Sequence, residues 1–259
     1  MKFTQIQLFK KTVVSLSVGV LLSACSLTTN QSNNENLFAK ALQSPLRSAV
    51  DKAKDPGRKP QQVMQFFGIE KDMTVLEILS SGGYYTEVIS KRVGKKGRVI
   101  AHNNKFILKA FDGKFAKDFE LHTTNNRLPN VAHYIKEFGQ FDLHEQADVA
   151  TIVLNYHDMY SNLGKEKRMK VISQIKMALK PGGIIGIIDM ESKNGPHQPK
   201  LHRIYHQRVL DELAEAGFIF EAKADFLENV DDDHSKVVFD PAIRGKTDRF
   251  VLKFRKPMA

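Results

Sequence analysis

A carboxylate and a glycine turn stand together early in the chain, in the stretch Met73 to Val88, MTVLEILSSGGYYTEV. Met73 to Leu79 is a short apolar run typical of a buried strand, and the apolar spacing after the glycines predicts a helix. A turn such as Ser80-Ser81-Gly82-Gly83 directs backbone N–H groups toward a ligand at the helix N-terminus, and its glycines leave no Cβ in the way. Glu77 would lie beside that space and could accept hydrogen bonds from a cationic or hydroxylated ligand.

A second polar cluster, Asn155-Tyr156-His157-Asp158, follows the apolar run Ala147 to Leu154. The run is nearly continuous in apolar residues, as expected of a central strand with both faces covered. In open α/β sheets, ligands bind at the carboxyl ends of the strands. The sequence therefore predicts that this cluster lies at the ligand-binding edge of a sheet.

Strand and helix patterns alternate along the rest of the chain, which predicts an α/β fold with a mostly parallel sheet and helices on both faces. The predicted strands are residues 73–79, 97–101, 131–135, 147–154, 184–188, 218–222 and 249–255. The predicted helices are residues 37–53, 61–67, 105–119, 165–179 and 201–216, together with the one that begins at Tyr84. Residues 231–246 form a long polar loop in this scheme.

Length and composition fit one sizeable globular domain with a tail. The chain has 259 residues, of which 42% are hydrophobic and 26% charged, enough to build an apolar core. Its formal net charge of +10 favours anionic partners without choosing among them. Because the chain has no zinc-finger spacing and no aromatic RNA-binding motif, we expect no nucleic acid partner.

The first residues predict export. Lys2, Lys10 and Lys11 precede an apolar run that is short for a bilayer span and ends in Leu-Ser-Ala-Cys, the pattern of a secretory signal. That ending resembles the bacterial lipobox, which implies a signal peptide over residues 1–24 and lipid attachment to Cys25, the only cysteine. Ser26, in place of aspartate, favours the outer membrane. We expect a flexible tether over residues 25–36, then a single domain over 37–259 in the cell envelope, facing the periplasm.

Several stretches together resemble the class I S-adenosylmethionine-dependent methyltransferases, and among them a family of exported methyltransferase-like bacterial proteins. VLEILSSGGYYTEV is similar to motif I of that fold. LKPGG, with the apolar run that follows it, is similar to the segment before strand five. The tail that begins at Asp231 is similar to the C-terminal part of the exported family. The resemblance covers roughly Gln61 to Arg255. It implies a Rossmann-like sheet of seven strands, the last antiparallel, and S-adenosylmethionine as cofactor.

The resemblance also implies a set of cofactor-binding positions. Glu77 matches the acidic residue of motif I, whereas Leu79 and Ser81 stand where the family prefers glycine. Asn103 stands about where an acidic residue holds the ribose hydroxyls, and an amide can still bond a diol. The full set of candidate cofactor-binding residues is Glu77, Ser81, Gly82, Gly83, Asn103, Glu137, Phe138 and Asn155, with Glu137 near the adenine amino group and Phe138 as a packing face.

Methyl transfer requires little from the protein beyond alignment of the reacting groups and a base where the acceptor carries a proton. His157 is the candidate base, with Asp158 or a nearby carboxylate to orient it; the alternative is a histidine that satisfies backbone groups at a strand end. We expect no metal site. His197, His202 and His206 include an i, i+4 pair, but a solvated helix face explains it better, and Asp231 to His234 is interpreted as a solvated loop.

Two functions remain open at this stage. The first is a methyltransferase anchored in the cell envelope, acting on a small molecule or an envelope substrate. The second is a ligand-binding or structural envelope lipoprotein that keeps the fold without turnover. Retention of Glu77, Gly82, Gly83 and Glu137 favours the first, whereas the loss of glycine at positions 79 and 81 favours the second. Redox chemistry with a dinucleotide is disfavoured because the dinucleotide fingerprint is absent.

Overall fold

The computed structural model describes residues 33–258 of the chain. The predicted signal peptide, Cys25 and most of the predicted tether lie outside the described residues. The chain divides into two compact units, Met1–Lys40 and Ala41–Ala259. Residues 33–42 are helical, so the last four residues of the predicted flexible tether, 33–36, form part of a helix. In the part of the chain that the structure describes, no helix has the length and apolar character needed to cross a membrane.

Seven strands form one sheet in the order β3-β2-β1-β4-β5-β7-β6. Strands β1 to β5 run parallel, and β7 is antiparallel to both of its neighbours, as predicted. The strands are β1 (Thr74–Ile78), β2 (Arg98–Asn103), β3 (Val131–Ile135), β4 (Ala147–Val153), β5 (Leu179–Met190), β6 (Ile219–Ala224) and β7 (Arg249–Arg255). The predicted fold class is therefore confirmed.

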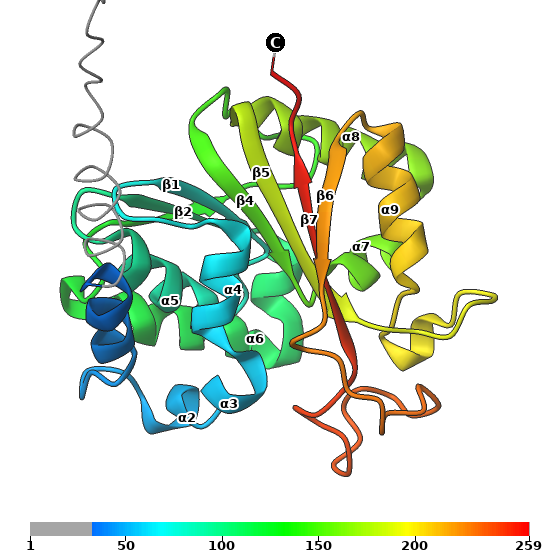
Figure 1. Ribbon diagram of the computed structural model, residues 1–259, viewed down its shortest axis with the longest axis horizontal. Coiled ribbons are helices and arrows are strands. Elements are labelled where there is room, and N and C mark those ends of the chain that lie inside the picture. Colours follow the sequence, from blue (N-terminus) through cyan, green and yellow to red (C-terminus); the bar gives the residue numbers. More distant parts are fainter. Residues whose placement is uncertain (1–32, 259) are drawn as a thin grey trace, which may run out of the picture. The chain divides into compact units, whose positions relative to one another are not determined.

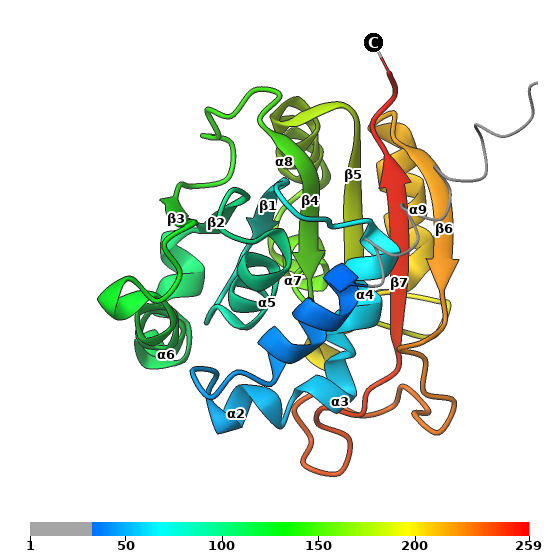
Figure 2. The ribbon, with the colours of Figure 1, turned by 60° about the vertical axis from the view of Figure 1, so that its left-hand side comes forward.

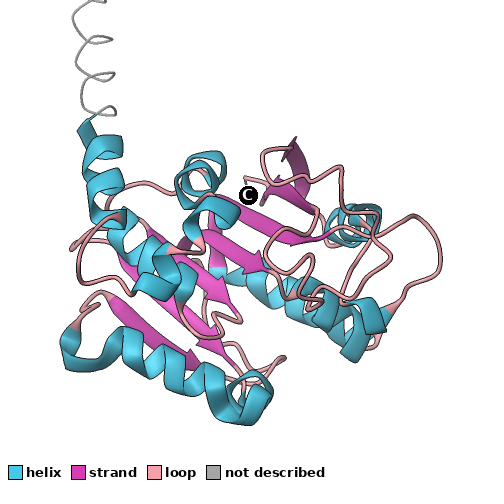
Figure 3. Ribbon diagram, turned by 90° about the horizontal axis from the view of Figure 1, so that it is seen from below, coloured by secondary structure: helices cyan, strands magenta, loops and turns pink. Residues whose placement is uncertain are grey.

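Helices cover both faces of this sheet (Figures 1 and 3). Figure 2 shows α4, α5 and α6 on one side and α7, α8 and α9 on the other. The α-helices of the second unit are α2 (Ala49–Lys52), α3 (Asp55–Arg58), α4 (Pro60–Phe67), α5 (Tyr84–Val93), α6 (Lys105–Thr123), α7 (Tyr156–Asn162), α8 (Lys165–Ala178) and α9 (His206–Glu215). The core is built from the buried apolar residues of the central strands and the helix faces that pack on them.

Four predicted elements differ from the observed ones. The predicted helix over 37–53 is broken, because Pro45 lacks an N–H and disfavours helical backbone at Ser44. Helix α6 extends to Thr123 and is interrupted at residues 110–113, where Ala110 is extended and the next three residues have positive φ. The predicted helix over 201–216 begins only at His206, after the short 3₁₀ helix Pro199–Leu201. Strand β5 includes the segment LKPGG, which was expected to precede it.

The strand order places a topological switch between β1 and β4. The chain passes from β1 to β2 and β3 on one side, then returns to β4 on the other side of β1. The register aligns Ile78 with Ile152, so the carboxyl ends of β1 and β4 lie level. Ligands of open α/β sheets bind in the crevice at such a point. The turn after β1 and the cluster that begins at Asn155 both lie there.

Candidate active site

The turn after β1 follows a backbone path suited to glycine although two of its residues are not glycine. Leu79 has φ 53° and Ser81 has φ 52°, both in the left-handed region, and Gly83 has φ 89°. For an L-residue, that conformation is less stable than the right-handed one by roughly 1–2 kcal/mol. The side chain of Leu79 is buried in the core, which offsets this strain at position 79. The turn therefore has glycine-like backbone angles without the glycines at 79 and 81.

Replacing Ser81 separates backbone strain from side-chain contacts. Ser81→Gly and Ser81→Ala both lose the hydroxyl, which donates to the Leu79 carbonyl at 3.1 Å. Only the alanine keeps a Cβ at positive φ, so we expect the glycine variant to be about 1 kcal/mol more stable than the alanine variant. Urea unfolding of the two proteins measures this difference. Equal stabilities would mean that the turn relaxes away from the observed angles.

Gly82 and Gly83 make room for helix α6 rather than for a ligand. A Cβ on Gly82 would lie 3.0 Å from Cβ of Asp118, and one on Gly83 would lie 3.3 Å from Nδ1 of His122. Both neighbours belong to α6, and Gly83 also needs its positive φ as the N-cap of α5. The side of each glycine on which a Cβ would stand therefore faces α6, and the cofactor-binding role of the two residues stays a prediction.

Asn103, at the end of β2, holds the turn in place. Its Oδ1 accepts from the Ser81 N–H at 2.8 Å, and its Nδ2 donates to the Ser81 carbonyl at 3.3 Å. The side chain is fully buried and so binds the backbone of the turn on both its amide atoms. In this arrangement the predicted ribose-binding residue braces the turn instead.

Glu77 lies inside the sheet with its carboxylate almost completely buried. Its Oε2 accepts from the Thr86 hydroxyl at 2.6 Å, which ties β1 to α5. Burial raises the pKa of Glu77 to about 7, although the Thr86 hydrogen bond and the charges of His122 and Arg58 act in the opposite direction. Burial therefore favours the protonated form of Glu77 in the folded protein.

Glu137 and Phe138 follow β3 at the same edge of the sheet. Glu137 Oε1 accepts from the backbone N–H of Lys105 at 3.2 Å, at the start of α6. The ring of Phe138 lies 5.7 Å from that of His102 and 6.3 Å from that of Phe141. Glu137 is half-buried, so it retains access to a ligand at this edge, whereas Phe138 is partly engaged in an aromatic cluster.

Asn155 joins the turn after β1 to the segment after β4. Its side-chain amide donates to the Leu79 carbonyl at 3.1 Å and to the Val153 carbonyl at 2.8 Å. The residue is buried and precedes α7, the short helix that the sequence patterns did not predict. Through this amide, the turn and the polar cluster Asn155 to Asp158 become one contiguous site.

Asp189, at the end of β5, orients His157. One carboxylate oxygen accepts from His157 Nδ1–H at 2.7 Å and the other from the His157 backbone N–H at 2.8 Å. Burial by itself lowers the pKa of His157, but the Asp189 charge and hydrogen bond raise it by more, so the net pKa lies above the ordinary value. Asp158 lies 3.4 Å from Nε2, so it faces the outer nitrogen and is not the residue that fixes the ring.

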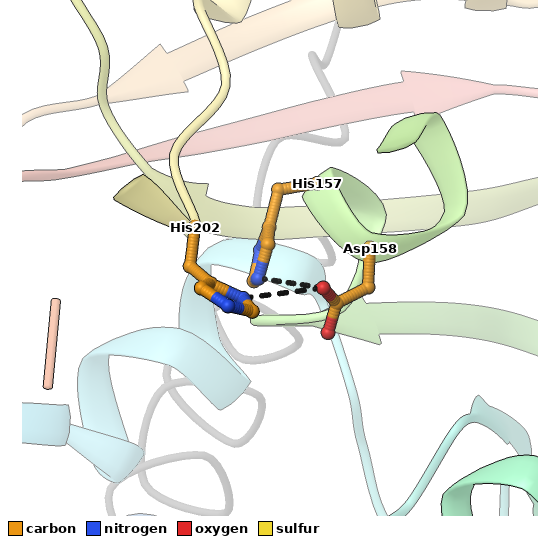
Figure 4. Close-up of side chains that lie close together, drawn as sticks. All are labelled: His157, Asp158 and His202. Atoms are coloured by element: carbon orange, nitrogen blue, oxygen red, sulfur yellow. Dashed lines mark ion pairs between the residues drawn. The ribbon is translucent and has the colours of Figure 1, made fainter. Parts of the chain in front are cut away.

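His202 completes this group from a distant part of the sequence. Its Nδ1 lies 3.3 Å from the same Asp158 oxygen, and its ring centre is 5.4 Å from that of His157. Figure 4 shows His157, Asp158 and His202 pointing toward one another. The sequence pattern paired His202 with His206 on one helix. That was wrong, because His202 has φ 53° and lies outside α9.

The other histidines and the acidic loop are engaged elsewhere. His197 Nε2 lies 2.9 Å from the Ser161 hydroxyl, and His206 Nδ1 lies 2.7 Å from Glu191. Residues 231–246 contain no helix or strand, as predicted. Within this loop, Asp232 pairs with Arg203 at 2.9 Å and His234 with Asp248 at 2.8 Å, so these two side chains bind separate partners rather than a shared cation.

One observation at the turn fits a bound ligand with polar groups. The Ser80 hydroxyl is buried and has no hydrogen-bond partner, which is costly unless a ligand or water supplies one. Together with the accessible Glu137 carboxylate, it provides groups for an amine- and hydroxyl-bearing cofactor such as S-adenosylmethionine. Two cavities of about 390 and 470 Å³ lie elsewhere: one beside His206 and His234, the other beside Asp55 and Lys59.

Comparison with solved structures identifies the fold. A SAM-dependent methyltransferase from Aquifex aeolicus has a TM-score of 0.57 at 21% identity, over 79% of this chain and 95% of that chain. A SAM-dependent methyltransferase from Methanosarcina mazei has a TM-score of 0.51 at 14% identity, over 73% and 95%. This chain has the methyltransferase fold. No protein-family model and no curated protein matches its sequence.

The methyltransferase fold by itself does not fix the reaction. The [4+2]-cyclase SpnF is similar to this chain with a TM-score of 0.56 at 15% identity, over 78% of this chain and 82% of that chain. The name of that protein describes a cyclisation and not methyl transfer. Function therefore has to be argued from the residues at the switch between β1 and β4.

Proposed function

We propose that this protein is an S-adenosylmethionine-dependent methyltransferase of the bacterial cell envelope. The observation that carries the proposal is the hydrogen bond from the Asn155 amide to the Leu79 carbonyl, at 3.1 Å. It joins the turn that matches motif I to the segment that presents His157. A cofactor at the turn would thus lie beside a histidine that is already oriented by Asp189.

When bound, S-adenosylmethionine supplies an activated methyl group, so the protein's own part is binding and alignment. Ser80 and Glu137 would hold its polar groups at the carboxyl ends of β1 and β3. On the acceptor side, Asp189 fixes His157 so that Nε2 faces Asp158, which is partly exposed. An imidazole nitrogen in this position can receive an acceptor's proton or hold its polar atom.

The location in the envelope is proposed from the N-terminal sequence. Leu22-Ser23-Ala24-Cys25 supports a lipid anchor on Cys25, and Ser26 supports the outer membrane, with the domain facing the periplasm. Labelling bacterial cells that express the protein with an alkyne fatty acid tests whether a lipid is attached to Cys25. Label should appear in the wild type and be absent from Cys25→Ser, and label that persists in that variant would overturn it.

A specific observation favours a second candidate, a non-catalytic envelope protein with the same fold. Helix α6 fills the space beside Gly82 and Gly83, and Asn103 is already bonded to the turn. Both features occupy groups that the cofactor would otherwise use. Such a protein would bind a different ligand at this edge, or none.

Titration calorimetry of the purified protein with S-adenosylmethionine distinguishes the two functions. We expect micromolar binding, weakened at least tenfold in Glu137→Ala, because a charge-assisted hydrogen bond is worth about 1.5–3 kcal/mol. Glu145→Ala is the matched control, since this exposed carboxylate precedes β4 at the opposite edge of the sheet. Absence of binding by the folded protein would favour the non-catalytic function. Gly83→Val is unsuitable as a probe, because its strain and clash with α6 would disturb the fold.

A further inference from the structure

His157, Asp158 and His202 form a group with the composition of a metal site. Each offers one ligand atom, and the three atoms lie within 4.8 Å of one another. The group contains two imidazole nitrogens and one carboxylate oxygen, a donor set suited to zinc and other divalent transition metals. Two of its residues come from the start of α7 and the third from the segment before α9 (Figure 4).

The distances between the Asp158 oxygen and the two imidazole nitrogens match those between ligand atoms around a metal ion better than those of direct hydrogen bonds. The Asp158 oxygen lies 3.4 Å from His157 Nε2 and 3.3 Å from His202 Nδ1. Both exceed the usual hydrogen-bond length of roughly 2.7–3.2 Å. Zinc bonds of about 2.0–2.1 Å in a tetrahedron separate adjacent ligand atoms by about 3.3 Å. The two separations from the Asp158 oxygen are therefore already those of ligands around one ion, and all three ligand atoms lie within 4.8 Å of one another.

Asp189 supplies the outer partner that metal-binding histidines require. It accepts from His157 Nδ1–H at 2.7 Å and is fully buried. This bond fixes the ring orientation and leaves the Nε2 lone pair directed toward Asp158. A carboxylate behind a histidine is the common arrangement in zinc sites, because it fixes the tautomer and increases the basicity of the ligand nitrogen.

His202 is held toward the group although its own nitrogen is unsatisfied. Its Nδ1 is buried and has no hydrogen-bond partner. The backbone of His202 is in the left-handed region, at φ 53°. Its ring packs against that of Phe239, with the two ring centres 4.8 Å apart. The next residue, Arg203, is fixed by a buried ion pair with Asp232. Strain and an unpaired buried nitrogen are costs that binding at this position would offset.

The described residues contain a second histidine–carboxylate group, formed by Asp51, Glu87 and His122. This second group is not suited to bind a metal ion. Its charges are already neutralised by nearby cations, with N···O distances from 2.8 to 3.8 Å. Those cations are Arg47, Lys54, Lys91 and Arg127. A metal ion there would face strong repulsion, so only the first group remains.

We propose that His157, Asp158 and His202 bind one divalent transition-metal ion, represented here by Zn²⁺, with Asp189 as the positioning residue behind His157. Three protein ligands leave a position for an oxygen or nitrogen atom of a small molecule, as in catalytic rather than structural zinc sites. The site lies next to Asn155, so such a molecule would be held near the turn after β1. Binding of the ion does not depend on the proposed cofactor, but an ion on His157 Nε2 would take the place of the proton that this nitrogen receives in the proposed function.

The test is calorimetric titration of the full-length, untagged protein with Zn²⁺ after treatment with a chelator. We expect one ion per chain, with affinity reduced at least 100-fold in His202→Ala and about 10- to 100-fold in Asp189→Asn. His144→Ala is the matched control, because this exposed histidine lies outside the group, and its affinity should equal that of the wild type. Cobalt(II) in place of zinc gives a visible spectrum that reports its coordination, and this spectrum should change in His202→Ala.

Thermal unfolding without metal verifies that each variant is folded, and His202→Ala should remain so because its side chain is about one-third exposed. Failure of the wild type to bind Zn²⁺ would overturn the proposal, as would full affinity in folded His202→Ala. Because no S-adenosylmethionine is present, neither result bears on the cofactor titration. A protein that binds the cofactor but no zinc would keep the proposed function and lose only the metal site.

Discussion

Glu212→Ala is expected to lower the free energy of unfolding by about 3–5 kcal/mol. Glu212 on α9 forms a buried ion pair with Arg168 on α8, with Nε of Arg168 donating to its two oxygens at 3.0 and 2.8 Å. It also accepts from the Tyr156 hydroxyl at 2.7 Å. Removing one partner of a buried pair leaves the other charge without compensation, which costs this amount. Urea denaturation at fixed pH measures the loss.

A surface pair on the same two helices is the control. Lys165 and Glu215 are 2.8 Å apart, but both side chains are more than half exposed, so Glu215→Ala should cost about 1 kcal/mol or less. Replacing Arg168 and Glu212 together by Met and Leu should recover part of the stability, because no unpaired charge remains although the buried Tyr156 hydroxyl loses its acceptor. Equal losses in Glu212→Ala and Glu215→Ala would mean that the inner pair is solvated.

The same substitution also bears on the site. Tyr156 directly precedes His157 in α7, and its hydroxyl is fixed only through Glu212 among the contacts seen in the described residues. Loss of that contact should loosen α7. We therefore expect Glu212→Ala to weaken Zn²⁺ binding as well, even under conditions where the protein remains folded.

Glu77→Gln is expected to stabilise the protein at alkaline pH. Since burial raises the pKa of Glu77 to about 7 from an ordinary 4.5, the folded state binds more protons than the unfolded state between these values. Stability of the wild type therefore falls as the pH rises from about 4.5 to about 7, by about 3 kcal/mol. Glutamine cannot ionise and can still accept from the Thr86 hydroxyl, so the variant lacks this loss.

The measurement is urea unfolding of both proteins on either side of that pH interval. The advantage of Glu77→Gln over the wild type should increase with pH and then stay constant above about pH 7. Glu70→Gln is the control, because this carboxylate pairs with Arg92 and is 40% exposed, so it should show no such gain. A constant difference between Glu77→Gln and the wild type at all pH values would show that the pKa of Glu77 is the same in the folded and unfolded states.

The fold, and the edge of the sheet at which the site lies, follow from sequence patterns alone. Apolar runs such as Ala147 to Leu154 specify buried parallel strands because they have no polar face to expose. The positions of Glu77, Glu137 and Asn155 at strand ends then predict that they lie at one edge of the sheet, because parallel strands have their carboxyl ends at the same edge. The helix predicted over 61–67 is likewise observed as α4, Pro60–Phe67, with Pro60 in its first turn and Gly68 as its C-cap.

Which side chains contact one another depends on the tertiary structure. Gly82 and Gly83 carry the signature of a ligand turn, yet their free space is taken by α6, a contact that local spacing does not encode. His202 joins His157 and Asp158 from more than 40 positions away, and its left-handed backbone removed it from the helix that its spacing with His206 suggested. Long-range packing sets such contacts, because side-chain direction depends on backbone angles and neighbours that a periodic pattern does not contain.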